Sequence, residues 1–202
     1  MGRAGWPAAA GVVIAMLWPP SADADDAKRV EEIVQGKCFI CHGMDGESSS
    51  PAFPRLAGQN AGYVARQLAD YKSGRRRSST MQPMVEDLGP ADFAALGAFF
   101  ASRPTHAHPV EDPGLAEVGR GVFLRGNPDS GVAACATCHG PNAHGSDALP
   151  RLAGQHPQYT ETQLRQFNRR SRTNDNDAMH AIASRLTEPE MRAVAAYLSG
   201  LK

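Results

Sequence analysis

The chain has 202 residues, a length that allows one or two small domains. Its 21 lysines and arginines balance its 21 aspartates and glutamates, so the charge gives no argument for a nucleic-acid-binding protein or for a polybasic membrane anchor. Apolar residues make up 42% of the chain and aromatic residues 6%, which is the balance of an ordinary soluble protein with few aromatics.

Residues 1–24 have the pattern of a secretory signal peptide. Arg3 gives a positive start, an apolar run follows from Ala8 to Trp18, and residues 22–24, Ala-Asp-Ala, have the small-x-small form of a signal-peptidase site. Cleavage after Ala24 would leave a mature chain that begins at Asp25. The apolar run is too short to span a bilayer, so a retained anchor is the less favoured alternative. We therefore predict export to the periplasm.

Every cysteine of the chain belongs to one of two Cys-x-x-Cys-His motifs. The first motif consists of Cys38, Cys41 and His42, and the second of Cys135, Cys138 and His139. Thiols three residues apart lie on one face of a helical turn, where each can form a thioether to a haem vinyl group, and the adjoining histidine can ligate the iron. A four-cysteine zinc site and a redox-active dithiol are the alternatives, but neither requires a histidine after both pairs. The motifs predict two covalently bound haem c groups.

The second half of the chain repeats the first. Segment 53–59 returns as 149–155, with Pro-Arg-Leu-Ala-Gly-Gln in both, and the spacing of seven residues from methionine to leucine occurs in both copies, as Met81 to Leu88 and as Met179 to Leu186. Repetition over this length indicates two copies of one domain. We assign the copies to residues 25–103 and 114–202. Between them, residues 104–113 hold three prolines, which stop a helix and form a semi-rigid linker.

Each copy shows three helices by the spacing of its apolar residues. The helix before the motif is marked by Val30, Ile33 and Val34, or by Leu115, Val118 and Val122 with Gly119 and Gly121 available for close packing. The middle helix is marked by Val64, Leu68 and Tyr71, or by Leu164 and Phe167, and a polar loop that carries a methionine follows it. The last helix carries Phe93, Leu96, Phe99 and Phe100, or, after a capping box at 187–190, Met191, Val194 and Leu198.

No stretch alternates as a strand would, so the predicted fold class is all-α, with two tandem helical domains related by the internal repeat. Each copy has about 80 residues, a size at which a protein core alone seldom gives much stability. We infer that a covalently held haem supplies the missing apolar mass in each copy.

The repeat also predicts the second axial ligand of each iron, since methionine is the neutral ligand that raises the potential of an electron-transfer haem. Only Met81 and Met179 occupy the same position in both copies. Met84 aligns with a packing residue, Met191 lies on the apolar stripe of the last helix, and Met44 is too close to the motif to reach the other haem face.

Several further residues have two interpretations. Pro54 and Pro150 either accept a hydrogen bond from the ligating histidine or only shape a turn. The arginine runs at 75–77 and 169–172 are either docking or propionate-binding groups, or a solvated face. His180 could replace Met179, but a surface position is favoured because the first copy has Gln82 there. The histidines without a counterpart are expected to be solvated: His106, His108, His144 and His156.

Two Cys-x-x-Cys-His domains in tandem, the Pro-Arg-Leu-Ala-Gly-Gln segment in both copies and the Arg-Thr-Asn-Asp-x-Asp stretch before Met179 resemble the dihaem cytochromes c4 over essentially the whole mature chain. The resemblance implies two class I cytochrome c domains packed about a pseudo-twofold axis, with haem propionates near the interface. It implies thioether links at both cysteine pairs and axial ligation by His42 with Met81 and by His139 with Met179. The stretch before Met81 lacks the Asn/Asp run of the second copy, so the two haem surroundings should differ.

We therefore expect an electron carrier with no substrate of its own, reduced by a quinol-oxidising complex or a dehydrogenase and, as the resemblance implies, oxidised by a terminal oxidase. No nucleic acid is expected as a partner, and peripheral attachment to a membrane stays open. The alternatives are a dihaem oxidoreductase of thiosulfate or peroxide type and the cytochrome subunit of a dehydrogenase. An enzyme needs an open or unusual axial position, whereas both copies hold a methionine there.

The charges near the two methionines differ, and this difference predicts unequal potentials. Asp175 and Asp177 precede Met179, whereas arginines 75–77 precede Met81. Negative charge favours the ferric form, so the second haem should have the lower potential.

Overall fold

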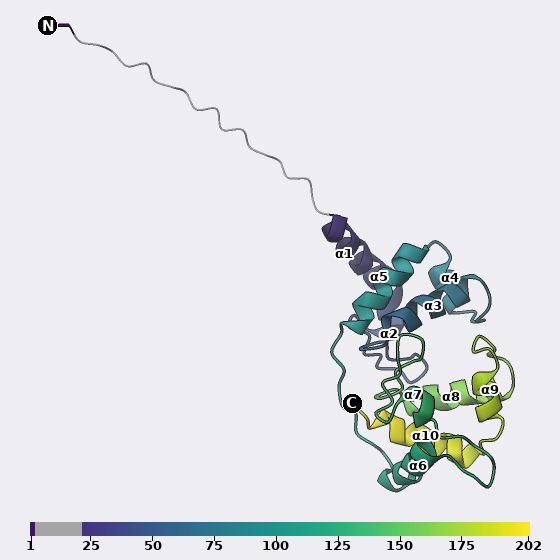
Figure 1. Ribbon diagram of the computed structural model, residues 1–202. Coiled ribbons are helices and arrows are strands. Elements are labelled where there is room, and N and C mark those ends of the chain that lie inside the picture. Colours follow the sequence, from purple (N-terminus) through teal and green to yellow (C-terminus); the bar gives the residue numbers. More distant parts are fainter. Residues whose placement is uncertain (3–21) are drawn as a thin grey trace.

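The computed structural model describes residues 1–2 and 22–202, which form two helical domains stacked one on the other (Figure 1). Within this part of the chain the only β-type pairings are isolated bridges between Asn127 and Val132 and between Ser146 and Leu149. This architecture confirms the all-α fold class. The predicted signal peptide lies mostly outside the described residues, and no helix among the described residues is long and apolar enough to cross a membrane.

The two domains contain the same helices in the same order. The first consists of α1 (Ala22–Ile33), which continues through a π-helical turn η1 (Val34–Cys38) into α2 (Phe39–His42), and then α3 (Ala61–Lys72), α4 (Met81–Val85) and α5 (Pro90–Ala101). The second consists of α6 (Pro113–Arg125), α7 (Ala136–His139), α8 (Pro157–Asn168), α9 (Ala178–Ala183) and α10 (Glu188–Ser199). The extended segment between α5 and α6 runs along one side of both domains (Figure 1).

The core of the first domain contains the residues that its apolar spacing predicts. Val30, Ile33 and Val34 are buried and pack with Phe93, Leu96 and Phe100 of α5, Val64 of α3, and Val85 and Leu88 at the end of α4. An ion pair between Arg29 and Asp92, with Nη2 and Oδ2 3.0 Å apart, also ties α1 to α5. Gly97 lets α5 approach the α3 backbone closely, because an added Cβ would overlap the Ala61 carbonyl.

The core of the second domain is built on the contact between α6 and α10. Gly119 lies against the backbone of Ala193, where an added Cβ would overlap a carbonyl oxygen. The predicted face of α6 is partly wrong, because Val118 is 59% exposed, whereas Ala116, Gly119, Val122 and Phe123 form the buried face. The side of α6 that carries Gly119 faces α10, because the missing side chain lets the two backbones approach closely. A glycine does not count as an apolar position, so the spacing of apolar residues does not predict this face.

Capping residues begin two helices of the second domain, one as predicted and one that was not predicted. Thr187 and Glu190 form the predicted capping box at the start of α10, with Glu190 N donating to Thr187 Oγ1 and Thr187 N to Glu190 Oε2. Pro113, expected in the linker, instead opens α6, where Asp112 caps the helix and a proline costs no hydrogen bond. The two methionines expected in polar loops lie on the short helices α4 and α9.

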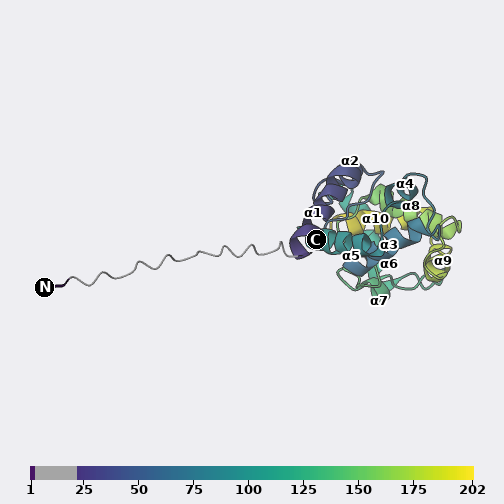
Figure 2. The same ribbon diagram turned by 90° about the horizontal axis from the view of Figure 1, so that it is seen from above.

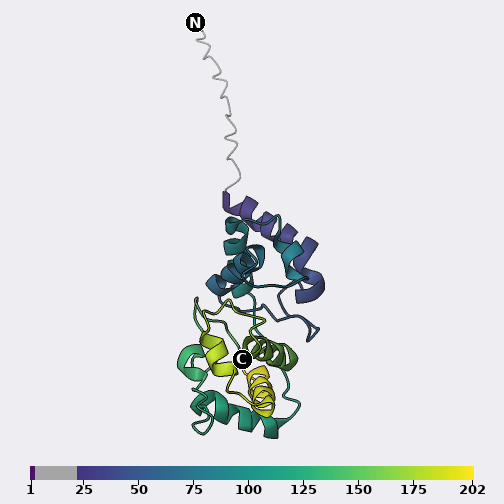
Figure 3. The same cartoon turned by 90° about the vertical axis from the view of Figure 1, so that its right-hand side faces the viewer.

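The domains meet through loops rather than through long helices. The two domains overlap when the molecule is seen from above (Figure 2). Seen from the side, the first domain lies above the second (Figure 3). The facing loops include the repeated segments 53–59 and 149–155, whose side chains hydrogen-bond across the boundary. The repeat motif is therefore an interface motif.

Candidate metal centres

Each Cys-x-x-Cys-His motif lies on a short turn of helix that presents its side chains together. Cys38 ends η1, and Cys41 and His42 lie on α2, while Cys135 caps α7 and Cys138 and His139 lie on it. All four thiols are free. Burial raises the pKa of Cys38 and of Cys135 to about 11, so these two thiols carry no charge at neutral pH.

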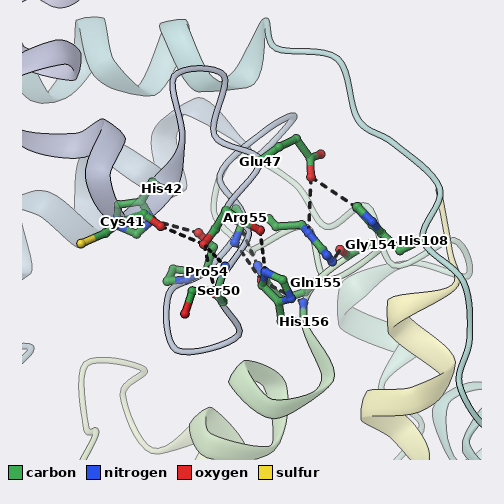
Figure 4. Close-up of polar contacts among 11 residues, drawn as sticks. Cys41, His42, Glu47, Ser50, Pro54, Arg55, His108, Gly154, Gln155 and His156 are labelled. Carbon is green, nitrogen blue, oxygen red and sulfur yellow. Dashed lines mark hydrogen bonds and ion pairs between the residues drawn. The ribbon is translucent and has the colours of Figure 1, made fainter.

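Each motif histidine is buried and held by one backbone carbonyl. His42 Nδ1 lies 2.9 Å from the oxygen of Pro54, a contact drawn in Figure 4, and His139 Nδ1 lies 3.3 Å from the oxygen of Pro150. A carbonyl only accepts, so Nδ1 carries the proton and Nε2 keeps a free lone pair. Burial also lowers the pKa of both imidazoles, which favours this neutral, ligating form. Of the two interpretations of these prolines, the structure contains the hydrogen bond to the histidine.

The structure separates the methionines by environment. Met81 and Met179 are half-buried, and each packs against the same core cluster as the first cysteine of its own domain. Met84 and Met44 are exposed, at 37% and 43%, and Met191 is fully enclosed in the core. Position and burial therefore support Met81 and Met179 as the ligands over the other candidates.

A covalently attached haem fits each set of residues. Two thiols on one helical turn can form thioethers to the haem vinyl groups, and an imidazole with a free Nε2 and a methionine packed on the apolar cluster are the iron donors of a low-spin haem c. The two cysteine pairs lie in different domains. In the described part of the chain no three His, Cys, Asp or Glu side chains gather as ligands for a metal ion, so the zinc interpretation has no geometric support.

The sequence suggested that the histidines outside the motifs are solvated, but the structure buries some of them. His106 and His144 are exposed, but His156 is buried at the domain interface, where its Nε2 lies 2.8 Å from the oxygen of Ser48 in the other domain. His108 is half-buried beside Glu47, with 3.3 Å between Nε2 and Oε2. His180, predicted at the surface, is half-buried, with Nδ1 2.9 Å from the Phe167 oxygen.

One arginine of each run is buried between the domains, Arg76 in the first and Arg172 in the second. Sequence reasoning did not predict this burial. Arg76 donates to Gln67 of its own domain and to Tyr159 and Gln163 of the other, at 2.8–3.0 Å. Arg172 makes the mirrored set, with Gln163, Gln67 and Tyr63, at 2.7–3.0 Å. The signal was available in the repeat, because arginine, tyrosine and glutamine recur 96 positions apart, but spacing alone did not tell an interface from a polar surface.

The buried guanidinium groups also affect the tyrosines beside them. Burial raises the pKa of Tyr71 to about 12 despite the nearby Arg76. Burial also acts to raise the pKa of Tyr63, but the positive charges of Arg172 and Arg76 outweigh it and lower that pKa. The neighbouring residues of both runs, such as Arg75, Arg77 and Arg170, are exposed. The docking interpretation therefore applies only to these outer arginines of the two runs, of which Arg75 and Arg170 also pair with Asp70 and Asp177.

Known proteins resemble the chain along both halves. The family described as Cytochrome c matches residues 27–103 and 129–202. A cytochrome c4 from Thiocapsa roseopersicina is 39% identical over 180 residues, which covers 87% of this chain and 93% of the relative. A thiosulfate dehydrogenase electron acceptor from Stutzerimonas stutzeri (strain A1501) is 36% identical over 210 residues, covering 97% and 94%. The crystal structure of reduced recombinant cytochrome c4 from Pseudomonas stutzeri has a TM-score of 0.80 at 36% identity, covering 90% and 99%.

Proposed function

The chain belongs to the cytochrome c family, within it to the dihaem cytochromes c4, and on this premise we propose that it is a periplasmic electron carrier with two His/Met-ligated haems. The observation that carries the proposal is the duplication of a whole ligand set. In each domain the first thiol of the motif and a half-buried methionine pack on one core cluster, and the motif histidine has its Nδ1 hydrogen-bonded.

The residues have separate tasks in this function. Cys38, Cys41, Cys135 and Cys138 would hold the two haems covalently, and the hydrogen bonds to Pro54 and Pro150 fix the imidazoles of His42 and His139 with Nε2 available for iron. Met81 and Met179 would supply the second donor to each iron. When bound, a haem with two strong-field axial ligands accepts and releases one electron. With a histidine and a methionine on each iron, substrate would have no open position at which to meet it, which favours a carrier over an enzyme.

An absorption spectrum with a haem count tests this proposal directly. We expect two haems for each chain, low-spin spectra in the ferric and ferrous states, and no stoichiometric binding of carbon monoxide by the untreated ferrous protein. A high-spin ferric spectrum would contradict His/Met ligation. One haem for each chain would contradict the duplicated site.

The physiological donor has two candidates, and one comparison favours the second. A quinol-oxidising complex with a terminal oxidase as acceptor is the arrangement expected for a respiratory carrier. The relative from Stutzerimonas stutzeri carries the name of an electron acceptor for thiosulfate dehydrogenase, which makes a thiosulfate-oxidising dehydrogenase the alternative donor. Stopped-flow reduction of the oxidised protein by each donor decides between them. Reduction by thiosulfate with no dehydrogenase present would instead show that the chain is itself an oxidoreductase.

A further inference from the structure

Two glutamines, one at the end of each repeated segment, reach into the opposite domain. Gln155 accepts from Arg55 N at 2.9 Å through Oε1 and donates to Arg55 O at 3.0 Å through Nε2. Gln59 does the same at Arg151, with 2.7 Å to the nitrogen and 2.8 Å to the oxygen. Both side chains are buried, so water does not compete for these bonds. Each carboxamide thus pairs with the other domain's backbone as a strand would.

The amide bonded by each glutamine belongs to the peptide group that holds a proximal histidine. Arg55 N and Pro54 O are parts of a single peptide unit, and Pro54 O accepts from His42 Nδ1 at 2.9 Å. The same arrangement joins Arg151 N and Pro150 O to His139 Nδ1. A chain of two hydrogen bonds therefore runs from each imidazole, through one peptide group, to a glutamine of the other domain. Figure 4 shows the chain from His42 through Pro54 and Arg55 to Gln155.

The position of each glutamine oxygen is fixed from both sides. Gln155 Oε1 also accepts from His156 N at 3.0 Å, and Gln59 Oε1 from Asn60 N at 3.0 Å, where α8 and α3 begin. Two donors therefore fix the orientation of each carboxamide. The amide hydrogen of Arg55 or Arg151 points at an oxygen whose position the helix start also holds.

Hydrogen bonds in such a chain strengthen one another. An amide whose N–H donates has a more negative carbonyl oxygen, so it accepts more strongly from the histidine Nδ1. A stronger bond at Nδ1 raises the basicity of the imidazole toward iron and favours the ferric state, which lowers the reduction potential. Each glutamine acts on the histidine of the domain to which it does not belong.

We propose that Gln155 and Gln59 are crossed positioning residues, each of which lowers the potential of the haem in the opposite domain by polarising the peptide that holds its proximal histidine. This inference rests on the proposed function, in which His42 and His139 ligate haem iron. It gives the domain interface an electronic task in addition to a structural one. Separation of the domains would weaken both proximal hydrogen bonds at once.

Redox titration of the holoprotein with Gln155→Leu and with Gln59→Leu tests the crossing. Gln155→Leu should raise the first-domain potential, and Gln59→Leu the second-domain potential, each by an about threefold change in the reduction equilibrium, or about 28 mV at 59 mV per tenfold change. The waves are assigned from the Met81→Ala and Met179→Ala variants. The ¹⁵N and ¹H shifts of the His42 and His139 ring N–H groups in the ferrous protein should move in the same crossed pattern.

Asn60→Leu is the matched control, because Asn60 Nδ2 crosses the same interface to His144 O and Leu149 O but bonds neither relay peptide. It should leave both potentials within error. An opened interface would act differently from a lost relay, since water admitted to the haems favours the charged ferric form and lowers both potentials. Unchanged potentials, a shift of the same domain's haem, or a downward shift of both waves would overturn the proposal.

Gln155→Glu keeps the inference testable if the leucine variants do not fold. A carboxylate accepts more strongly than a carboxamide, so this variant should lower the first-domain potential more than the second. Equal shifts in both domains would indicate only the added charge and would overturn the relay. If the spectra of the unaltered protein show no histidine-ligated haem, the proposed function has failed. If the spectra are as expected and the potentials do not follow the crossed pattern, only the relay has failed.

Discussion

Single residues at each Cys-x-x-Cys-His motif suit a site for an apolar macrocycle. Burial keeps the Cys38 and Cys135 thiols protonated and, by lowering the pKa of the His42 and His139 imidazoles, favours their uncharged form. Uncharged groups cost far less to bury than ions do. The hydrogen bond from each Nδ1 satisfies the imidazole N–H and leaves Nε2 as the uncharged donor.

The methionine assignment predicts the behaviour of two single variants. Met81→Ala should open the first haem and Met179→Ala the second, because each domain carries its own ligand set and core. Carbon monoxide binding to the ferrous protein should rise from none to one equivalent in each variant, while the other haem keeps its low-spin spectrum. Met84→Ala is the control, since Met84 is exposed. Opening of the first haem by Met84→Ala would refute the assignment.

The environments of the two methionines differ by one charge, which bears on the predicted order of potentials. Met179 N donates to the Asp175 carboxylate at 2.6 Å, whereas Met81 N donates to the neutral Ser78 hydroxyl at 3.1 Å. Asp175→Asn should therefore raise the second-domain potential in a redox titration. Asp177→Asn should change it less, since Asp177 is exposed and paired with Arg170. A higher potential in the second domain of the unaltered protein would contradict this charge argument.

His156 predicts a pH dependence of stability. Burial lowers its pKa in the folded chain, and the nearby Arg55 and His108 also lower it, while the bond to Ser48 O and the charge of Glu47 oppose the shift. The unfolded chain then binds the proton more readily, so the stabilisation is complete above the unfolded pKa of about 6.5 and is lost as pH falls through the lower folded value.

His156→Asn should remove part of this dependence, because the first copy has Asn60 at the equivalent helix start and asparagine does not titrate. The difference in melting temperature between pH 7 and pH 5 should be smaller in the variant than in the unaltered protein. His106→Asn is the control, since His106 is exposed. Equal pH dependence in all three proteins would show that His156 does not contribute.

At the scale of helices, apolar spacing predicted most elements and failed where close backbone contact decides the packing. The faces of α1, α5 and α10 agree with the spacing, because large apolar side chains fill those contacts. On α6 the contact is made by Gly119, so the apolar Val118 beside it is left exposed. The helices α4 and α9 were expected as loops because they are a turn or two long and begin at the methionine or one residue before it.

The α6–α10 contact predicts opposite effects of the same substitution at two nearby glycines. Gly119→Ala should lower the free energy of unfolding by about 2 to 3 kcal/mol, since its Cβ would overlap the Ala193 carbonyl and the backbones must separate. Gly121→Ala should leave stability unchanged or raise it by up to about 1 kcal/mol, because its Cβ meets only the end of the flexible Arg125 side chain and alanine favours a helix.

Denaturant unfolding of the two holoprotein variants measures this pair. A loss of stability in Gly121→Ala as large as that in Gly119→Ala would mean that the helix crossing is not the cause. Far-UV circular dichroism should show the same helix content in both folded variants.

For the molecule as a whole, the repeat predicted two domains but not how they join. A polar residue that recurs in both copies indicates a shared role, yet Arg76, Gln59 and their counterparts have the same chemistry as a solvated surface. Burial of an arginine becomes favourable only when several neutral acceptors converge on it, and two of the three acceptors of Arg76 come from the other domain. The interface forms only when both domains are folded and packed together. The residue pattern within one domain therefore does not predict it.

The crossed arginines therefore predict the cooperativity of unfolding. Arg76→Leu removes three hydrogen bonds from a charged donor, two of them across the interface to Tyr159 and Gln163. Such bonds are worth about 1.5 to 3 kcal/mol each, so their loss should exceed the relief of repulsion between the two buried guanidinium groups. Calorimetry of the holoprotein should show one transition in the unaltered chain and two separate domain transitions in Arg76→Leu. Arg77→Leu, at the exposed neighbouring position, should keep the single transition, and the same result for Arg76→Leu would show that the network does not couple the domains.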